Sequence, residues 1–161
     1  MPPSSQRTAD SGLDLRFLFS ELVRLETELW DAVEGRLRQD FGVTLPVFEF
    51  LQVISRIPAC RVQDIAVELS ITVGGTSKIV DRIEASGYCV RGANPNDRRS
   101  SVIKLTPAGE RLLPQLTAAV DDELRERLGT DVPDRTLLQL TKTLTRLRAA
   151  VRDAGTIEKT A

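Results

Sequence analysis

The basic side chains between Thr72 and Thr106 are the strongest chemical signal in the sequence. Lys78 and Arg82 lie four residues apart, at the spacing of one helix face, and Arg98 and Arg99 are adjacent in a turn-forming stretch. This stretch has six cationic and three anionic side chains, whereas the whole chain of 161 residues has a net charge of -1. Such a cationic surface suits phosphate oxygens. The alternative is a solvated basic surface or a set of structural ion pairs.

Other kinds of site have weaker support. The sequence contains no histidine, which is the commonest metal ligand and the commonest general base. The two cysteines, Cys60 and Cys89, cannot form a tetrathiolate zinc site. We therefore expect no enzyme, no metal site and no cofactor. Each cysteine is most simply a small buried hydrophobic residue. The alternative is a redox sensor, in which Arg61 or Arg91 would lower the thiol pKa.

The cationic residues fall in a predicted helix-turn-helix followed by a β-hairpin. Apolar residues at helical spacing indicate a first helix at 62–69, and Thr72 is predicted to cap a second helix that ends near Ser86. Gly87 suits the left-handed residue that ends a helix, and two extended segments follow on either side of the turn at 94–97. The outward side of the second helix is predicted to be small or basic. It consists of Val73, Gly74, Ser77, Lys78, Asp81 and Arg82.

Amphipathic helices are predicted on both sides of this unit. Leucines in steps of three and four indicate helices at 13–39 and 134–152, and Thr44 is predicted to cap a helix at 45–56. A further helix is expected at 107–128. The apolar faces of the first and last helices lack partners within one chain, so we expect a two-fold homodimer.

The expected organisation follows from these elements. We predict a disordered tail at 1–12, an N-terminal dimerisation helix at 13–43, a winged domain at 44–106, C-terminal dimerisation helices at 107–152 and a mobile tail at 153–161. No apolar run approaches the ~20 residues of a membrane span, and the first residues lack the apolar core of a signal peptide. We therefore expect a cytoplasmic protein with no membrane partner.

Three motifs resemble the multiple antibiotic resistance regulator (MarR) family of winged helix-turn-helix transcription regulators. They are DRIEASGY at 81–88, NPNDRRS at 94–100 and IKLTPAGERLL at 103–113. The family pattern is Asp-Arg-Leu-(x)3-Gly at the end of the recognition helix, Asp-x-Arg at the wing tip and Leu-Thr-x-x-Gly before the next helix. The resemblance covers nearly the whole chain in element order. It implies a mainly α fold with a small β-hairpin wing and long terminal dimerisation helices.

The resemblance also implies a bacterial regulator, usually a repressor, that binds an inverted-repeat operator in double-stranded DNA. Small and basic side chains on the second helix could enter the major groove, and arginines on the hairpin tip suit the adjacent minor groove. The predicted DNA-binding residues are Thr72, Val73, Gly74, Gly75, Ser77, Lys78, Arg82, Arg98 and Arg99. Many relatives carry Ser and Thr where this sequence has Gly74 and Gly75. The alternative function is a winged-helix adaptor that binds protein and not DNA.

Family members often bind a small aromatic effector in a cleft between the dimerisation helices and the winged domain. The aromatic residues expected near such a cleft are Trp30, Phe41, Phe48 and Phe50. The alternative for most of them is packing in the hydrophobic core.

Overall fold

The computed structural model describes residues 12–94, 97, 99–129 and 131–157. Most of the predicted N-terminal tail, Arg98 of the wing and residues 158–161 therefore lie outside the described residues. The elements are α1 (Leu15–Phe41), α2 (Leu45–Arg56), α3 (Val62–Leu69), α4 (Val73–Ala85), β1 (Cys89–Ala93), β2 (Ser101–Leu105), α5 (Pro107–Leu128) and α6 (Asp134–Ile157). This order confirms the predicted mainly α fold with a β-hairpin wing.

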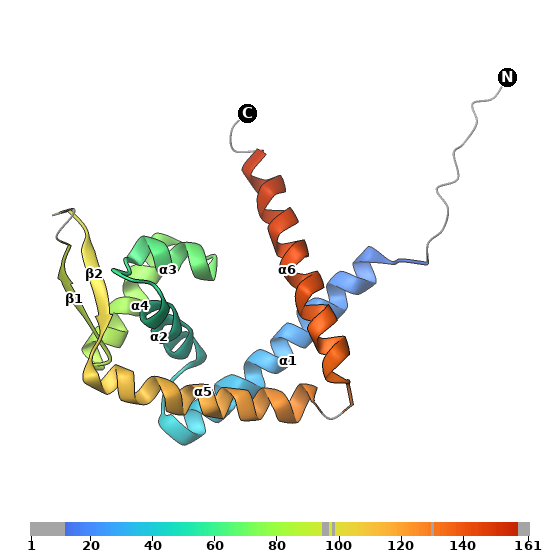
Figure 1. Cartoon of the computed structure of the whole chain (residues 1–161), viewed down its shortest axis with the longest axis horizontal. Coiled ribbons are helices and arrows are strands. Elements are labelled where there is room, and N and C mark those ends of the chain that lie inside the picture. Colours follow the sequence, from blue (N-terminus) through green and yellow to red (C-terminus); the bar gives the residue numbers. More distant parts are fainter. Residues whose placement is uncertain (1–11, 95–96, 98, 130, 158–161) are drawn as a thin grey trace.

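The elements form two regions joined by α5. At one end, α2, α3, α4 and the wing (β1 and β2) pack together; we call this the winged unit (Figure 1). Helix α5 runs from the base of the wing to the other end of the molecule, where α1 and α6 extend away from the winged unit (Figure 1). Within the described residues, no helix is both long and apolar enough to cross a membrane.

Helix α2 lies at the centre of the core because its apolar residues occupy most of its circumference. Phe50 and Leu51 are fully buried, and Phe48, Val53 and Ile54 are nearly so. Neighbouring elements each contribute a fully buried aliphatic side chain to the same cluster. These side chains are Leu37 of α1, Ile65 of α3, Ile83 of α4, Ile103 of β2 and Leu116 of α5.

Local hydrogen bonds explain where the helices begin. The hydroxyl of Thr72 accepts from the N–H of Gly75 at 3.2 Å, and that of Thr106 accepts from the N–H of Gly109 at 3.1 Å. Thr44 does not cap α2 with its side chain as predicted. The carboxylate of Glu34 in α1 accepts from the N–H of Leu45 instead. A side chain from another helix has replaced the local cap.

The wing is anchored on both sides. Its strands are antiparallel, with Arg91 opposite Ile103. The N–H of Ile103 donates to the carbonyl of Cys60 at 2.7 Å, which joins β2 to the connection between α2 and α3. Gly87, with φ 79°, provides the predicted left-handed residue between α4 and β1. The base of the wing is therefore part of the winged unit.

The terminal helices differ from the prediction in length. Helix α1 covers Leu15–Phe41 rather than 13–39, and α6 continues to Ile157, beyond the predicted end at Arg152. The predicted C-terminal tail at 153–161 is therefore helical in its first part. Alanine at 154 favours a helix, and the cost of about 1 kcal/mol for the glycine at 155 is too small to end one.

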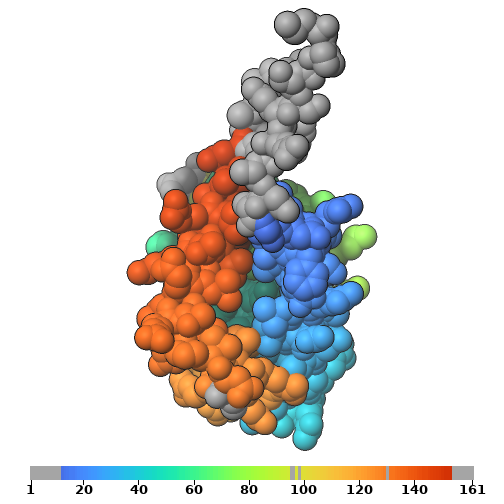
Figure 2. Space-filling view, turned by 90° about the vertical axis from the view of Figure 1, so that its right-hand side faces the viewer, coloured from blue at the N-terminus to red at the C-terminus, as the bar shows by residue number. Residues whose placement is uncertain are grey.

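Helices α1 and α6 leave apolar side chains in contact with solvent. Leu15 and Leu18 of α1 and Leu147 and Val151 of α6 are exposed. Among residues 134–153, whose side chains are described, none of α6 is fully buried. Figure 2 shows the face of the molecule formed by these two helices and part of α5. In α1 only the part near its C-terminal end is buried, at Val33 and Leu37, so α6 and the first part of α1 have an amphipathic pattern whose apolar side chains the described protomer leaves exposed.

Candidate nucleic-acid interface

The outer side of α4 carries most of the predicted DNA-binding residues. Thr76, Val80 and Ile83 are buried on its inner side. Thr72, Val73, Gly74, Lys78 and Arg82 are exposed, whereas Gly75 and Ser77 are half-buried. We call the outer surface formed by Thr72, Val73, Gly74, Ser77, Lys78 and Arg82 the reading face. Its small residues leave the helix backbone accessible, and its cations lie beside that backbone.

Gly74 and Gly75 have different local surroundings. A Cβ added to Gly75 would lie 3.1 Å from the capping hydroxyl of Thr72, so this glycine makes room for the cap. A Cβ added to Gly74 would meet no described atom within 4 Å. Packing therefore gives a reason for Gly75 but not for Gly74. At Gly74, the missing side chain leaves space for a ligand outside the helix.

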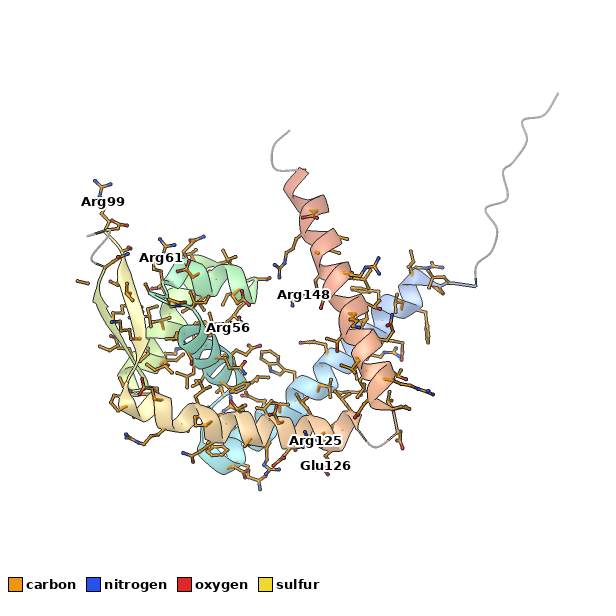
Figure 3. All side chains as sticks on the ribbon, viewed as in Figure 1. Arg56, Arg61, Arg99, Arg125, Glu126 and Arg148 are labelled. Carbon is orange, nitrogen blue, oxygen red and sulfur yellow. The ribbon has the colours of Figure 1, made fainter. Side chains whose placement is uncertain are left out.

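Arg99 places a cation at the wing tip. Its N–H donates to the carboxylate of Asp97 at 2.9 Å, so Asp97 shapes the backbone of the tip. Figure 3 shows Arg99 at the outer end of the wing, pointing away from the helices. The structure thus gives Asp97 a positioning role and leaves the Arg99 side chain exposed.

Arg91 is the cation whose role the sequence pattern did not reveal. Its guanidinium lies 2.7 Å from Asp81 Oδ1 and 2.6 Å from Glu84 Oε2. Its backbone N–H donates to Glu84 Oε1 at 2.8 Å. This backbone bond, followed by the side-chain bond from Arg91, lowers the pKa of Glu84. The spacing of Asp81 and Glu84, three residues apart on one helix, was a signal that a single cation could join them.

Lys78, Arg82 and Arg99, the other described cations of the interface, differ from Arg91 in their surroundings. Among the described residues, Lys78, Arg82 and Arg99 form no ion pair with a carboxylate. The alternative of structural ion pairs therefore applies to Arg91 and not to these three residues. Their charge is available to an anionic partner.

The two cysteines are buried inside the winged unit. Cys60 is 0% exposed and Cys89 is 2% exposed, and both are free thiols. Burial raises the pKa of each thiol to about 11. A redox sensor needs an exposed thiol of low pKa, and neither cysteine has that environment. The described residues also contain no group of three or more His, Cys, Asp or Glu side chains that could hold a metal ion.

The four aromatic candidates do not gather at one site. Phe48 and Phe50 are buried in the core because α2 is apolar on most sides, and Phe41 packs partly buried against it. Trp30 instead lines an open apolar groove of about 460 Å³ between α1, α5 and α6. The walls of this groove include Leu25, Leu29, Leu124 and Leu144. The walls of this groove are therefore formed mainly by leucines of the helices and not by the phenylalanines. The sequence pattern did not predict its position.

Comparison with known proteins places this geometry in a family. The model of the MarR family matches residues 41–100, which cover the winged unit from its first helix to the wing tip. A putative transcriptional regulatory protein for the hcr operon of Thauera aromatica is 33% identical over 108 residues. That match covers 65% of this chain and 64% of the relative, so the chain spans less than two thirds of the relative's length.

Solved structures extend the similarity to the terminal helices. AbsC, a MarR family regulator from Streptomyces coelicolor, is 21% identical with a TM-score of 0.77 over 86% of this chain and 94% of AbsC. CouR from Rhodococcus jostii bound to p-coumaroyl-CoA is 26% identical with a TM-score of 0.71, covering 89% and 95% of the two chains. CouR has also been solved on a 23-mer DNA duplex, and that structure has a TM-score of 0.75 at 22% identity, covering 90% of this chain and 99% of CouR. With its helix-turn-helix, its hairpin wing and these similarities, the chain belongs to the MarR family of winged helix-turn-helix transcription regulators.

Proposed function

We propose that the protein is a sequence-specific DNA-binding transcription regulator that acts as a homodimeric repressor in the bacterial cytoplasm. The observation that carries this proposal is the combination of the reading face on α4 with Arg99 on the wing. Lys78 and Arg82 are exposed and unpaired among the described residues, and a helix of this shape fits the major groove. Arg99 would then reach the adjacent minor groove, where the negative potential is strong.

The terminal helices support the homodimer in this proposal. Leu140, Leu147 and Val151 of α6 and Leu15 and Leu18 of α1 are exposed, and burial against a second copy would remove them from water. Two reading faces related by a two-fold axis, about 34 Å apart, would select an inverted repeat. The domain division at 13–43, 44–106 and 107–152 follows from this arrangement and remains a prediction.

Selection of bound sequences from random duplex DNA tests the proposal directly. We expect an inverted repeat whose half-sites lie about one helical turn apart. Recovery of no enriched sequence, together with binding to a protein partner, would favour the adaptor alternative.

A salt titration on the selected duplex provides a second test. Each neutralised phosphate contributes about -0.9 to the slope of log affinity against log salt, so Lys78→Ala should make that slope less steep by about one per protomer contact. Lys142→Ala is the matched control because Lys142 lies on α6, outside the winged unit. A slope that is the same in both variants would show that Lys78 does not contact phosphate.

A small aromatic effector is the second part of the proposal. The groove beside Trp30 is apolar, and the relative CouR was solved with the aromatic thioester p-coumaroyl-CoA. Because the chain contains a single tryptophan, ligand entry can be followed by Trp30 fluorescence. We expect aromatic carboxylates or their thioesters to quench this fluorescence. The same ligands should weaken operator binding, because they would favour a dimer in which the spacing of the two reading faces differs. Leu144→Arg, placed in the groove wall, should abolish the quenching.

A further inference from the structure

Arg91 joins the wing to α4 through hydrogen bonds and ion pairs. Its side chain is 23% exposed and reaches Asp81 and Glu84, and one guanidinium nitrogen lies 3.4 Å from the carbonyl of Ser77. Beyond Arg91, the side chains of Asn94, Asp97 and Ser100 make hydrogen bonds within the wing itself. The polar contacts of Arg91 thus hold the wing to α4, and Asp97 of the tip adds an electrostatic attraction to Arg61, the residue before α3.

The same level of the hairpin is held on its other strand. Arg91 pairs with Ile103 in the sheet, and the N–H of Ile103 donates to the carbonyl of Cys60 at 2.7 Å. One strand is thus attached to α4 through charge-assisted hydrogen bonds, and the other is attached to the connection before α3. Gly92 and Ala93, the next residues toward the tip, are exposed. The wing changes at this point from an anchored base to a projecting tip.

We infer that Arg91 is a positioning residue for the wing. Without contacting DNA, it fixes the direction in which the tip leaves α4, so that Arg99 and the reading face can meet neighbouring grooves together. A tip free to pivot would lose more conformational freedom on binding, and Arg99 would contribute less affinity. This inference rests on the proposed DNA-binding function. It adds a role for Arg91, whose guanidinium binds carboxylates of α4 and not a phosphate of DNA.

Two simpler roles for Arg91 make different predictions. If Arg91 contributed only to the stability of the fold, its loss would lower the amount of folded protein. The change in DNA affinity caused by Arg99→Ala would then be the same with and without Arg91. If Arg91 contacted phosphate itself, its effect and that of Arg99 would add as for two independent contacts. A positioning role instead makes the contribution of Arg99 depend on Arg91.

A double-mutant cycle measures this dependence on the selected operator at fixed salt. We expect Arg99→Ala to weaken binding by roughly tenfold in the wild-type background and by about twofold or less in the Arg91→Ala background. Lys78→Ala is the matched control. Because Lys78 lies on the reading face itself, its effect should be the same with and without Arg91. Hydroxyl-radical footprinting should show protection at the wing's minor groove in the wild type and its loss in Arg91→Ala.

A second variant removes the same link from α4. Asp81→Ala with Glu84→Ala keeps Arg91 but deletes its carboxylate partners, and alanine is well tolerated in a helix. This variant should also reduce the effect of Arg99→Ala to about twofold or less. An undiminished effect of Arg99→Ala in both backgrounds would overturn the inference, as would a wild-type affinity that does not depend on Arg99. Failure of the wild type to bind any duplex would instead refute the proposed function.

Discussion

The winged unit and the terminal helices differ in what covers their apolar side chains. In the winged unit, Leu51, Ile65 and Ile83 are each at most 1% exposed, and the protomer itself covers them. In α1 and α6, Leu15 is 66% exposed and Val151 is 72% exposed. The winged unit therefore surrounds a core that the protomer closes with residues of α1 and α5, whereas α6 and the first part of α1 carry an apolar surface that the described protomer does not bury. Stability should depend on contacts within the protomer in the first region and on association in the second.

Matched leucine substitutions give the largest expected contrast. Leu51→Ala should lower the free energy of unfolding by about 2–5 kcal/mol at any protein concentration, because it leaves a cavity in a closed core. Leu147→Ala, at a position 47% exposed, should change the free energy of unfolding of the monomer by less than about 0.5 kcal/mol. It should instead raise the dimer dissociation constant. Urea denaturation and sedimentation equilibrium measure the two quantities, and equal losses for both variants in the monomer would remove the contrast.

Glycine-to-alanine substitutions test the same contrast at smaller magnitude. A Cβ on Gly109 would lie 2.1 Å from the carbonyl oxygen of Tyr88, so α5 or the start of β1 must shift. We expect Gly109→Ala to destabilise the protein by about 1–3 kcal/mol. Gly35→Ala in α1 is the control, since its Cβ would meet no described atom within 4 Å and should stabilise the helix by about 0.5–1 kcal/mol. Thermal melts of the two variants should therefore shift in opposite directions.

The buried thiols predict a pH dependence that belongs to the winged unit. Burial raises the pKa of Cys60 and Cys89 from 9.0 to about 11, so the unfolded chain loses these protons first. Their contribution to stability is complete below pH 9 and is lost as the pH rises to 11. At pH 10 each thiol should lower the free energy of unfolding by about 1 kcal/mol relative to its value at pH 8. Cys89→Ala should flatten the profile between pH 8 and pH 10, and an unchanged slope would contradict the prediction.

Gly74 should give the smallest effect on stability. Because a Cβ there meets no described atom within 4 Å, Gly74→Ala should leave the fold intact and raise stability by up to about 1 kcal/mol. The added methyl group should nevertheless weaken operator binding, since it separates the α4 backbone from the DNA. Denaturation and anisotropy titration of the same variant would measure both changes. Gain of stability with unaltered affinity would exclude close approach of DNA at this position.

Much of the winged unit could be predicted from local sequence. The bounds of α2, the cap at Thr72 and the left-handed Gly87 each depend on residues close in the chain, and all three agree with the structure. The placement of the exposed cations of α4 also follows from helical periodicity. These features need no knowledge of distant contacts.

The features that the sequence pattern did not reveal depend on contacts between distant residues. The sequence pattern assigned Arg91 to the basic surface, but in the folded chain Arg91 forms ion pairs with Asp81 and Glu84. The cap of α2 comes from Glu34, eleven residues before the bond it makes with Leu45. Phe48 and Phe50 were candidates for a cleft but face the core. In each case, tertiary packing decided between two roles that the residue type allowed.

The hydrogen bond between Ile103 and Cys60 has a mechanical consequence. It closes a loop of more than forty residues and ties the wing base to the segment before α3. A force transmitted through α5 would therefore rotate the winged unit as a rigid body and would not bend the base of the hairpin. A displacement of the far end of α5 would then reach the base of the wing as a change of angle, with the internal shape of the winged unit preserved.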